Sequence, residues 1–134
     1  MRVCCVYNQS VIQKTFHYSD IGGDTITQML VKLLGEKNDK KIDHDIGEKI
    51  KKKYCQVALD YEQALLSSSS IDENGIHIGS ERFTASEILF QPVLIDSKEP
   101  SMMQLIIDAI NACPKQLQKE MISSIAIVGG SSLL

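Results

Sequence analysis

Apolar residues recur at helical spacing in several stretches of the chain. The spacing i, i+3, i+4, i+7 and i+8 predicts a helix over 25–35, and the same period predicts one long helix over 45–65. Shorter helices are predicted over 82–90 and 115–121. A further helix is expected over 101–113 because a capping box stands at its first residue. Four apolar side chains would form its buried face, namely Met103, Ile106, Ile107 and Ile110.

Runs of β-prone residues alternate with these helices. Residues 3–7 and 11–17 predict two strands joined by a turn that begins at Asn8. The pair Asn74-Gly75 predicts a type I′ hairpin, because both central residues of that turn need positive φ. The continuous apolar run 125–128 is typical of a buried strand. The order of elements therefore predicts a mixed α/β fold with an inserted helical lobe.

Composition narrows the class of protein. A chain of 134 residues with 43% hydrophobic and 23% charged residues predicts one compact globular domain, or two small lobes that share a core. A net charge of -3 argues against direct nucleic-acid binding, and the basic run 49–53 is interpreted as a solvated helix face. No apolar run approaches the roughly 20 residues of a membrane span. We therefore expect a location in the cytoplasm or the nucleus.

Spacing alone predicts no specific chemistry. The four cysteines lack the paired spacing of a zinc site and are expected to be free thiols, and no histidine has a catalytic partner at diagnostic spacing. Two glycine pairs, Gly22-Gly23 and Gly129-Gly130, each stand before an expected change of direction. Either pair is a simple turn or a place where backbone amides approach a nucleotide. A P-loop motif is absent.

Several ordered stretches resemble the actin and actin-related protein family. Residues 21–27 are similar to the segment that opens the family's inserted lobe, and residues 51–63 resemble its lysine-rich helix. Residues 78–83 and 87–92 resemble two further blocks, and 129–132 resembles the family's glycine-glycine-threonine-threonine turn. The resemblance implies a partial α/β fold of the actin, heat-shock chaperone and sugar-kinase superfold, with a small helical inserted lobe.

The resemblance also implies a division of the chain and a limit on its activity. Residues 1–20 and 96–134 would be incomplete parts of the large lobe on the pointed-end side, and residues 21–95 would be the smaller inserted lobe. The family's two phosphate loops, and the residues that orient the attacking water, would lie before Met1. The chain is therefore expected to hold no catalytic residue and no metal ligand, and to be no enzyme by itself.

According to the resemblance, this chain retains only the adenine and ribose side of the family's nucleotide site. Lys52 stands where the family has a glutamate that contacts the ribose, and lysine cannot accept a hydrogen bond from a hydroxyl. Leu134 stands where the family has a tyrosine beside the base. No cofactor is therefore expected for this chain alone, and these departures weaken the case for ATP or ADP even in a longer version. The expected cofactor-side residues are Gly23, Lys51, Gly130 and Ser131.

The implied function is that of a truncated or divergent, non-catalytic actin-related protein. The loop 91–100 departs from the one that conventional actin uses between filament strands, and residues 105–130 are somewhat similar to the pointed-end actin-related subunit of dynactin. Expected partners are other actin-family or cytoskeletal subunits, with self-association as a further option and no direct membrane contact. The cytoplasmic cytoskeleton is the expected location. The alternatives are a fragment of a nucleotide-binding actin-like ATPase and a nuclear subunit of a chromatin-remodelling assembly.

Overall fold

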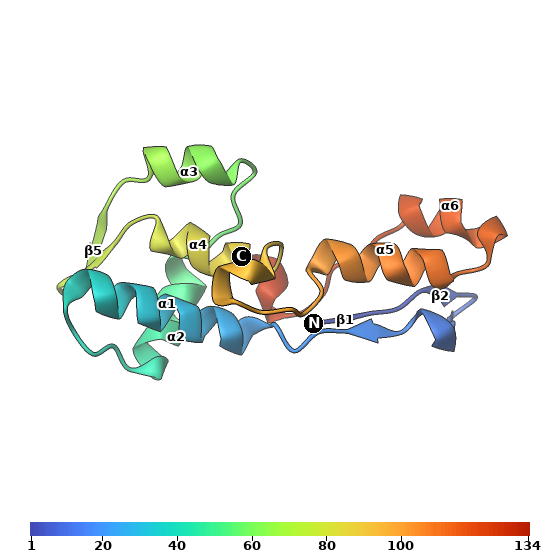
Figure 1. Cartoon of the computed structure of the whole chain (residues 1–134), viewed down its shortest axis with the longest axis horizontal. Helices are drawn as coiled ribbons and strands as arrows, with labels where there is room; N and C mark the ends of the chain where they lie inside the picture. Colours follow the sequence, from blue (N-terminus) through green and yellow to red (C-terminus); the bar gives the residue numbers. More distant parts are fainter.

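The computed structural model describes all 134 residues and has two groups of elements along its long axis (Figure 1). One group contains helices α1 to α4 with a β-hairpin, and the other contains α5 and α6 with short strands. Both chain ends lie near the middle, where the two groups meet. The elements of the first group lie within residues 21–95, and we keep the name inserted lobe for that range; the assignment to the family's two lobes stays a prediction.

Helix α1 (Gly23–Asn38) begins with a hydrogen bond from the Gly22 amide to the Thr25 hydroxyl, at 3.2 Å. It extends three residues beyond the predicted end at position 35, and the chain then turns at Asp39 with φ of 49°. The Asn38 side chain accepts a hydrogen bond from the His77 amide at 2.8 Å. This contact ties the end of the helix to the neighbouring hairpin.

The prediction of one long helix over 45–65 is wrong. The structure has two helices, α2 (His44–Tyr54) and α3 (Tyr61–Ser67). The backbone leaves helical geometry at Cys55, which has φ of −69° and ψ of 142° and whose side chain is buried in the core. The carboxylate of Asp60 then accepts a hydrogen bond from the Gln63 amide at 3.0 Å. Burial of Cys55 and the new N-cap at Asp60 therefore stabilise two separate helices, although the apolar residues continue at helical spacing.

A hairpin and two short helical segments complete the inserted lobe. Strands β5 (Ile71–Glu73) and β6 (Ile76–Ile78) pair antiparallel, and the predicted type I′ turn is confirmed by φ of 54° at Asn74 and 74° at Gly75. Helix α4 (Glu81–Glu87) is shorter than the predicted helix over 82–90 and is followed by the 3-10 helix η2 (Pro92–Ile95).

The core of the inserted lobe lies between α1, α2, α4 and β6. Complete burial of an aliphatic side chain stabilises a fold by about 1.5–3 kcal/mol, so these residues supply most of the lobe's stability. The cluster has 12 buried residues: Ile21, Ile26, Leu30, Leu34, Ile42, Ile50, Cys55, Ile76, Ile78, Ala85, Ile88 and Leu89.

The N-terminal segment forms two antiparallel ladders of very short strands. The predicted turn is confirmed, with φ of 48° at Asn8 and 62° at Gln9. The predicted strand over 11–17 is interrupted by a 3-10 turn, which the Thr15 amide closes by donating to the Ile12 carbonyl at 2.9 Å. The Thr15 hydroxyl also accepts a hydrogen bond from the Cys5 amide at 2.8 Å. The elements are β1 (Arg2–Val3), β2 (Val6–Tyr7), β3 (Ser10–Val11), η1 (Gln13–Thr15) and β4 (His17–Tyr18), with β1 paired to β4 and β2 to β3.

Helix α5 (Met102–Ala112) lies against β1, η1 and β4, and helix α6 (Lys115–Ser123) lies against α5. The predicted N-cap of α5 is confirmed, since the Ser101 hydroxyl accepts a hydrogen bond from the Gln104 amide at 3.2 Å. The predicted buried face is wrong, because Met103 and Ile107 are 51% and 46% exposed. Only one side of α5 has elements to pack against, so the buried positions are Leu105 and Ala109.

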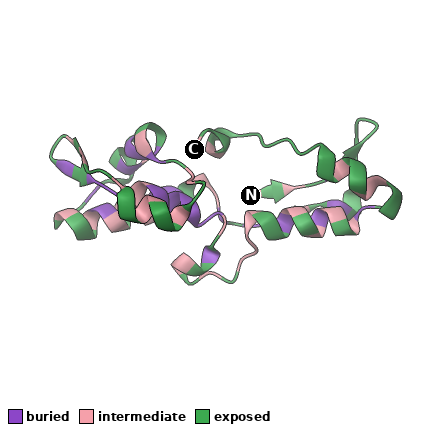
Figure 2. Ribbon diagram, turned by 90° about the horizontal axis from the view of Figure 1, so that it is seen from above, coloured by how far each residue is buried: buried purple, intermediate pink, exposed green.

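The predicted buried strand over 125–128 is also not formed. This segment is extended but pairs with no other strand, and Ile125, Ile127 and Val128 are 53%, 61% and 89% exposed. Figure 2 shows it as an exposed stretch that runs from α6 to the last turn, η3 (Gly130–Leu133). No other segment of the chain supplies a neighbouring strand. None of the helices is both long and apolar enough for a membrane span.

Candidate functional site

Lys51 is the centre of a polar cluster between the start of α1 and the end of α2. Its side chain is only 10% exposed, and its ammonium group donates hydrogen bonds to three acceptors. These are the Gly23 carbonyl oxygen at 2.9 Å, the Thr27 hydroxyl at 2.8 Å and the Glu48 carboxylate at 2.5 Å. A lysine ammonium has three protons, so each one is used inside the chain.

Glu48 balances the charge of this cluster. Its carboxylate accepts hydrogen bonds from Lys51 and from the Thr27 hydroxyl, the latter at 2.7 Å, and forms an ion pair with Lys52 at 3.1 Å. Hydrogen bonds from Lys51 first, and then from Thr27 and Lys52, lower the pKa of Glu48 to about 2. The carboxylate is thus ionised at neutral pH. Lys52, which the resemblance aligns with the family's ribose-contacting glutamate, is thus paired with Glu48.

Three of the four expected cofactor-side residues lie together. A Cβ atom added to Gly23 would be 3.2 Å from the Ser131 hydroxyl and 3.5 Å from the Lys51 ammonium. Gly130 is the exception, because it is exposed and an added Cβ atom would meet nothing within 4 Å. Leu134 packs against the core of the inserted lobe. The last turn of the chain is therefore held against the start of α1.

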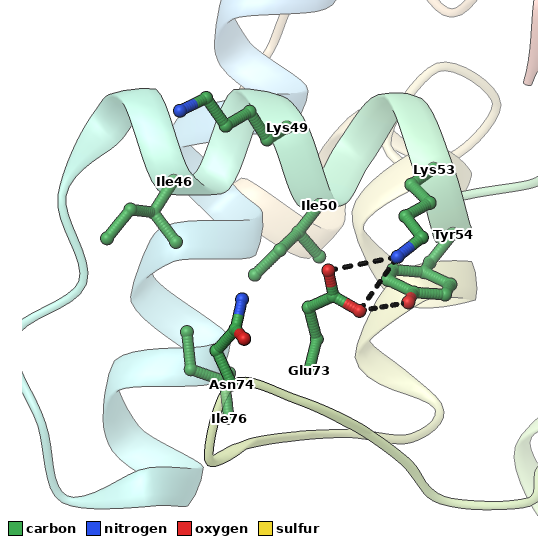
Figure 3. A pocket seen from close by; sticks show the side chains of 8 residues that line it. All are labelled: Ile46, Lys49, Ile50, Lys53, Tyr54, Glu73, Asn74 and Ile76. Atoms are coloured by element: carbon green, nitrogen blue, oxygen red, sulfur yellow. Dashed lines mark hydrogen bonds and ion pairs between the residues drawn. The ribbon is translucent and has the colours of Figure 1, made fainter.

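Two surface cavities lie away from this cluster. The first, of about 280 Å³, lies between α2 and the β5–β6 hairpin (Figure 3). Glu73 lines it and accepts hydrogen bonds from the Lys53 ammonium, at 2.8 Å, and from the Tyr54 hydroxyl. These bonds, that of Lys53 first, lower the pKa of Glu73. The remaining lining residues are Ile46, Lys49, Ile50, Asn74 and Ile76.

Charged side chains line both cavities. In the first, Lys53 and Glu73 form an ion pair at 2.8 Å, Lys49 is the third charged residue, and the other lining side chains are mainly apolar (Figure 3). The second cavity, of about 260 Å³, is open and lies between α1 and η2. No group of three or more His, Cys, Asp or Glu side chains is placed to hold a metal ion.

The exposed large apolar side chains are concentrated outside the inserted lobe. Within residues 21–95 only four are exposed: Ile46, Leu59, Leu66 and Val93. Residues 1–20 and 96–134 have a hydrophobic cluster of only three buried residues, Cys5, Ala109 and Cys113, and Leu105 is buried outside this cluster. The same parts expose Val6, Tyr7, Val11, Phe16, Tyr18, Met103, Ile107, Ile122, Ile125, Ile127, Val128 and Leu133.

The four cysteines are free, as the sequence predicts. Cys4 is exposed, whereas its neighbour Cys5 is buried, which agrees with side chains that point to opposite faces. Cys55 and Cys113 are also buried. Burial raises the pKa of Cys55 to about 12, so its thiol is protonated and unreactive at neutral pH.

Comparison with known proteins decides the family. The actin family matches residues 39–134, which is more than half of the chain. This chain belongs to the actin family. The assignment confirms the resemblance found in the sequence, and with it the partial α/β actin-like fold.

Relatives match almost the whole chain but only part of their own length. Actin-related protein 2 of Saccharomyces cerevisiae is 28% identical over an alignment of 141 positions, gaps included, which covers 96% of this chain and 36% of that protein. Actin-related protein 2 of Drosophila melanogaster is 31% identical over an alignment of 144 positions, which covers 98% of this chain and 36% of that protein. Putative actin-29 of Dictyostelium discoideum is 26% identical over 144 residues. The chain thus spans a little more than a third of the length of these relatives.

Proposed function

We propose that this chain acts through protein–protein contacts, as a non-catalytic subunit of an actin-family assembly. The proposal rests on one contrast within the chain: the polar groups around Lys51 are paired with one another, whereas many apolar side chains are exposed. All three ammonium protons of Lys51 have acceptors within the chain, whereas apolar side chains outside the inserted lobe remain uncovered. Burial of apolar surface drives protein association, at about 25 cal/mol per Å².

This chain has few of the groups that phosphoryl transfer from a nucleotide requires. Phosphoryl transfer needs positioned donors and a metal around the phosphates, and the family's phosphate loops have no counterpart among these residues. The only lysine beside Gly23 and Ser131 is already paired with Glu48. We therefore propose that the chain has no ATPase activity and binds ATP or ADP only weakly.

The proposed partners are other actin-family subunits in the cytoplasmic cytoskeleton. The similarity to relatives named actin-related protein 2 supports an actin-related assembly of this kind. The finer similarity to the pointed-end subunit of dynactin remains a prediction from the sequence. The nuclear chromatin-remodelling subunit and the ATPase fragment are the alternatives that the experiments below separate from it.

A phosphate-release assay with magnesium and ATP tests the absence of catalysis. We expect no turnover above buffer, and a calorimetric dissociation constant for ATP weaker than about 10 μM, or about 7 kcal/mol. Gly130→Val is the matched variant, since Gly130 is exposed and has free space around it. Magnesium-dependent turnover that this variant abolishes would establish the ATPase alternative.

Affinity purification of the full chain from separated cytoplasmic and nuclear fractions tests the partner class. We expect actin-family subunits from the cytoplasmic fraction, retained at moderate salt because apolar burial is not screened. Chromatin-remodelling subunits from the nuclear fraction, with none from the cytoplasm, would favour the nuclear alternative and contradict the proposal.

A further inference from the structure

Two buried thiols lie together between the N-terminal segment and helix α5. Cys5 and Cys113 are 6% and 4% exposed, and with Ala109 they form the small hydrophobic cluster of this part of the chain. The Cys5 thiol donates a hydrogen bond to the Ala109 carbonyl oxygen at 3.5 Å. That carbonyl is one of the last four of α5, which have no amide partner within the helix. The Cys5 thiol therefore lies on the last turn of α5, beside the position where Cys113 ends the helix.

Hydrogen bonds hold the backbone on both sides of this contact. The Cys5 amide donates to the Thr15 hydroxyl at 2.8 Å, and the Cys5 carbonyl accepts from the Ile12 amide at 2.9 Å. The Cys113 amide bonds back to α5 at 3.0 Å, and its carbonyl accepts from the Gln118 side chain at 3.1 Å. A disulfide needs two backbones that are already close, because its Cβ atoms lie only about 3.5–4.5 Å apart. Two thiols of one small cluster, on fixed backbones, are well placed for such a bond.

No other two cysteines of the chain share a buried cluster. Cys4 is exposed, and Cys55 is buried in the separate core of the inserted lobe. Cys5 and Cys113, in contrast, affect each other directly. Burial raises the pKa of Cys5 most, and the neighbouring Cys113 thiol raises it further, against a lowering effect of the Thr15 hydroxyl.

We propose that Cys5 and Cys113 form an intramolecular disulfide when a small disulfide, such as oxidised glutathione, reacts with the chain. One cysteine thiolate attacks a sulfur of the small disulfide, which gives a mixed disulfide and releases one thiol of the reagent. The second cysteine thiolate attacks the protein sulfur of this mixed disulfide, so the Cys5–Cys113 bond forms and the second reagent thiol leaves. The chain loses two electrons and two protons, and the small disulfide gains both.

Burial determines how fast this bond forms and how long it lasts. A protonated thiol inside a cluster attacks slowly, so the reaction requires a local opening. A cluster of three residues has few apolar contacts, and regions of this kind open at the lowest cost in free energy. After the region closes again the bond is covered, and a reductant reaches it slowly. We therefore expect slow formation and slow reversal in the folded chain.

The bond would fasten the N-terminal segment to α5. The two cysteines are more than a hundred residues apart, and the loop that they close contains the whole inserted lobe. A disulfide stabilises mainly by restricting the unfolded chain, and this effect grows with the length of the loop. We therefore expect the urea midpoint of the oxidised chain to rise by about 1 M or more.

Incubation of the full chain in buffers of reduced and oxidised glutathione tests the bond. The Cys4→Ala variant is used throughout, so that the exposed thiol does not compete. Free thiols are then blocked, and the chain is digested with trypsin without a reductant. Mass spectrometry should find one linked pair of peptides, residues 3–14 and 99–115, which separates on reduction. Urea unfolding of the oxidised and reduced chains measures the shift of the midpoint.

Cys55→Ala is the matched control, because it removes a buried thiol from the other core. The linked pair should persist in this variant and be lost in Cys113→Ala. Refolding from urea in the same glutathione buffer exposes every thiol, so burial no longer limits the reaction. The proposal is overturned when neither the native nor the refolded chain forms the link, or when Cys5 links to Cys55 or to a second chain. It is also overturned when the linked chain unfolds at the midpoint of the reduced one. None of these results alters the proposed function, which the assays of ATP turnover and partner capture decide.

Discussion

Replacing Lys51 with methionine tests whether this lysine supports the fold or serves a nucleotide. Methionine keeps most of the apolar stem and removes the ammonium group that joins the Gly23 carbonyl, Thr27 and Glu48. Hydrogen bonds to a charged group contribute about 1.5–3 kcal/mol, and breaking a fully buried ion pair costs about 3–5 kcal/mol. The Glu48 side chain is 32% exposed and regains some water. We therefore expect a loss of about 2–3 kcal/mol.

Urea unfolding followed by far-ultraviolet circular dichroism measures this loss, because the chain has no tryptophan for fluorescence. With a slope of about 1–2 kcal/mol per molar urea, a loss of about 2–3 kcal/mol should lower the midpoint by about 1–3 M. Lys52→Met is the matched control, since Lys52 pairs with the same carboxylate but its side chain is 72% exposed. An exposed pair contributes about 0–1 kcal/mol, so this variant should unfold near the natural midpoint.

A second variant separates the two interpretations of Lys51. Adding Glu48→Gln to Lys51→Met removes the carboxylate that the single variant leaves unpaired, so part of the lost stability should return. Equal, small effects of Lys51→Met and Lys52→Met would refute the structural role. A stable Lys51→Met variant that has also lost measurable ATP binding would show that the lysine is reserved for a nucleotide.

Three further predictions follow from particular contacts. Gly47→Ala should lower the free energy of unfolding by about 1–3 kcal/mol through overpacking, because the added Cβ atom would lie 2.3 Å from a Val31 methyl group. Adding Val31→Ala to this variant should restore the urea midpoint. The pKa of Glu48 falls on folding from 4.5 to about 2, so its stabilisation is present above the unfolded pKa and is lost as pH falls towards the folded one. As the pH falls through that range, the urea midpoint of the natural chain should decline more than that of the Glu48→Gln variant. An equal decline in both would contradict the assignment of this pKa shift to Glu48. Cys4 should be alkylated in the native chain and Cys55 only after unfolding, as mass spectrometry can count; rapid native labelling of Cys55 would contradict its burial.

The features predicted correctly from the sequence are those set by a few neighbouring residues. The hairpin at Asn74-Gly75 follows from the need for positive φ at both positions. The cap at Ser101 follows from the free amides that any helix N-terminus exposes. The turn at Asn8 is equally local. In each case the chemistry that decides the structure lies within four residues, so distant parts of the chain cannot override it.

The features predicted wrongly depend on distant packing. Helical period continues through 55–60, but Cys55 is drawn into the core formed by α1 and α4, and the helix breaks there. The run 125–128 has the composition of a buried strand, yet the chain supplies no strand beside it. The face of α5 that is buried depends on which elements lie beside it, and Met103 stays 51% exposed because little covers it. Apolar periodicity shows which residues can be buried. Which of them are buried depends on the elements that pack beside them.

The candidate site also combines features that the sequence could predict with features that it could not. Spacing could not bring Gly23 and Ser131 together, because more than a hundred residues separate them, and only the family resemblance predicted that both belong to one site. Glu48 was missed. Its position three and four residues before Lys51 and Lys52 places all three side chains on one helix face. That spacing was the available signal for an internal ion-pair cluster.

The unequal burial of the two parts of the chain bears on how the protein functions. A core of 12 residues closes the inserted lobe, and its central lysine has no free proton to donate to a ligand. The remaining parts share a hydrophobic cluster of three residues, with Leu105 buried outside it, and keep their strand edges and one face of α5 exposed. A ligand gains little from groups that are already paired, whereas a protein that covers apolar surface gains from every residue it buries. The proposed function therefore places its binding surface outside the inserted lobe, with a second protein chain as the proposed ligand.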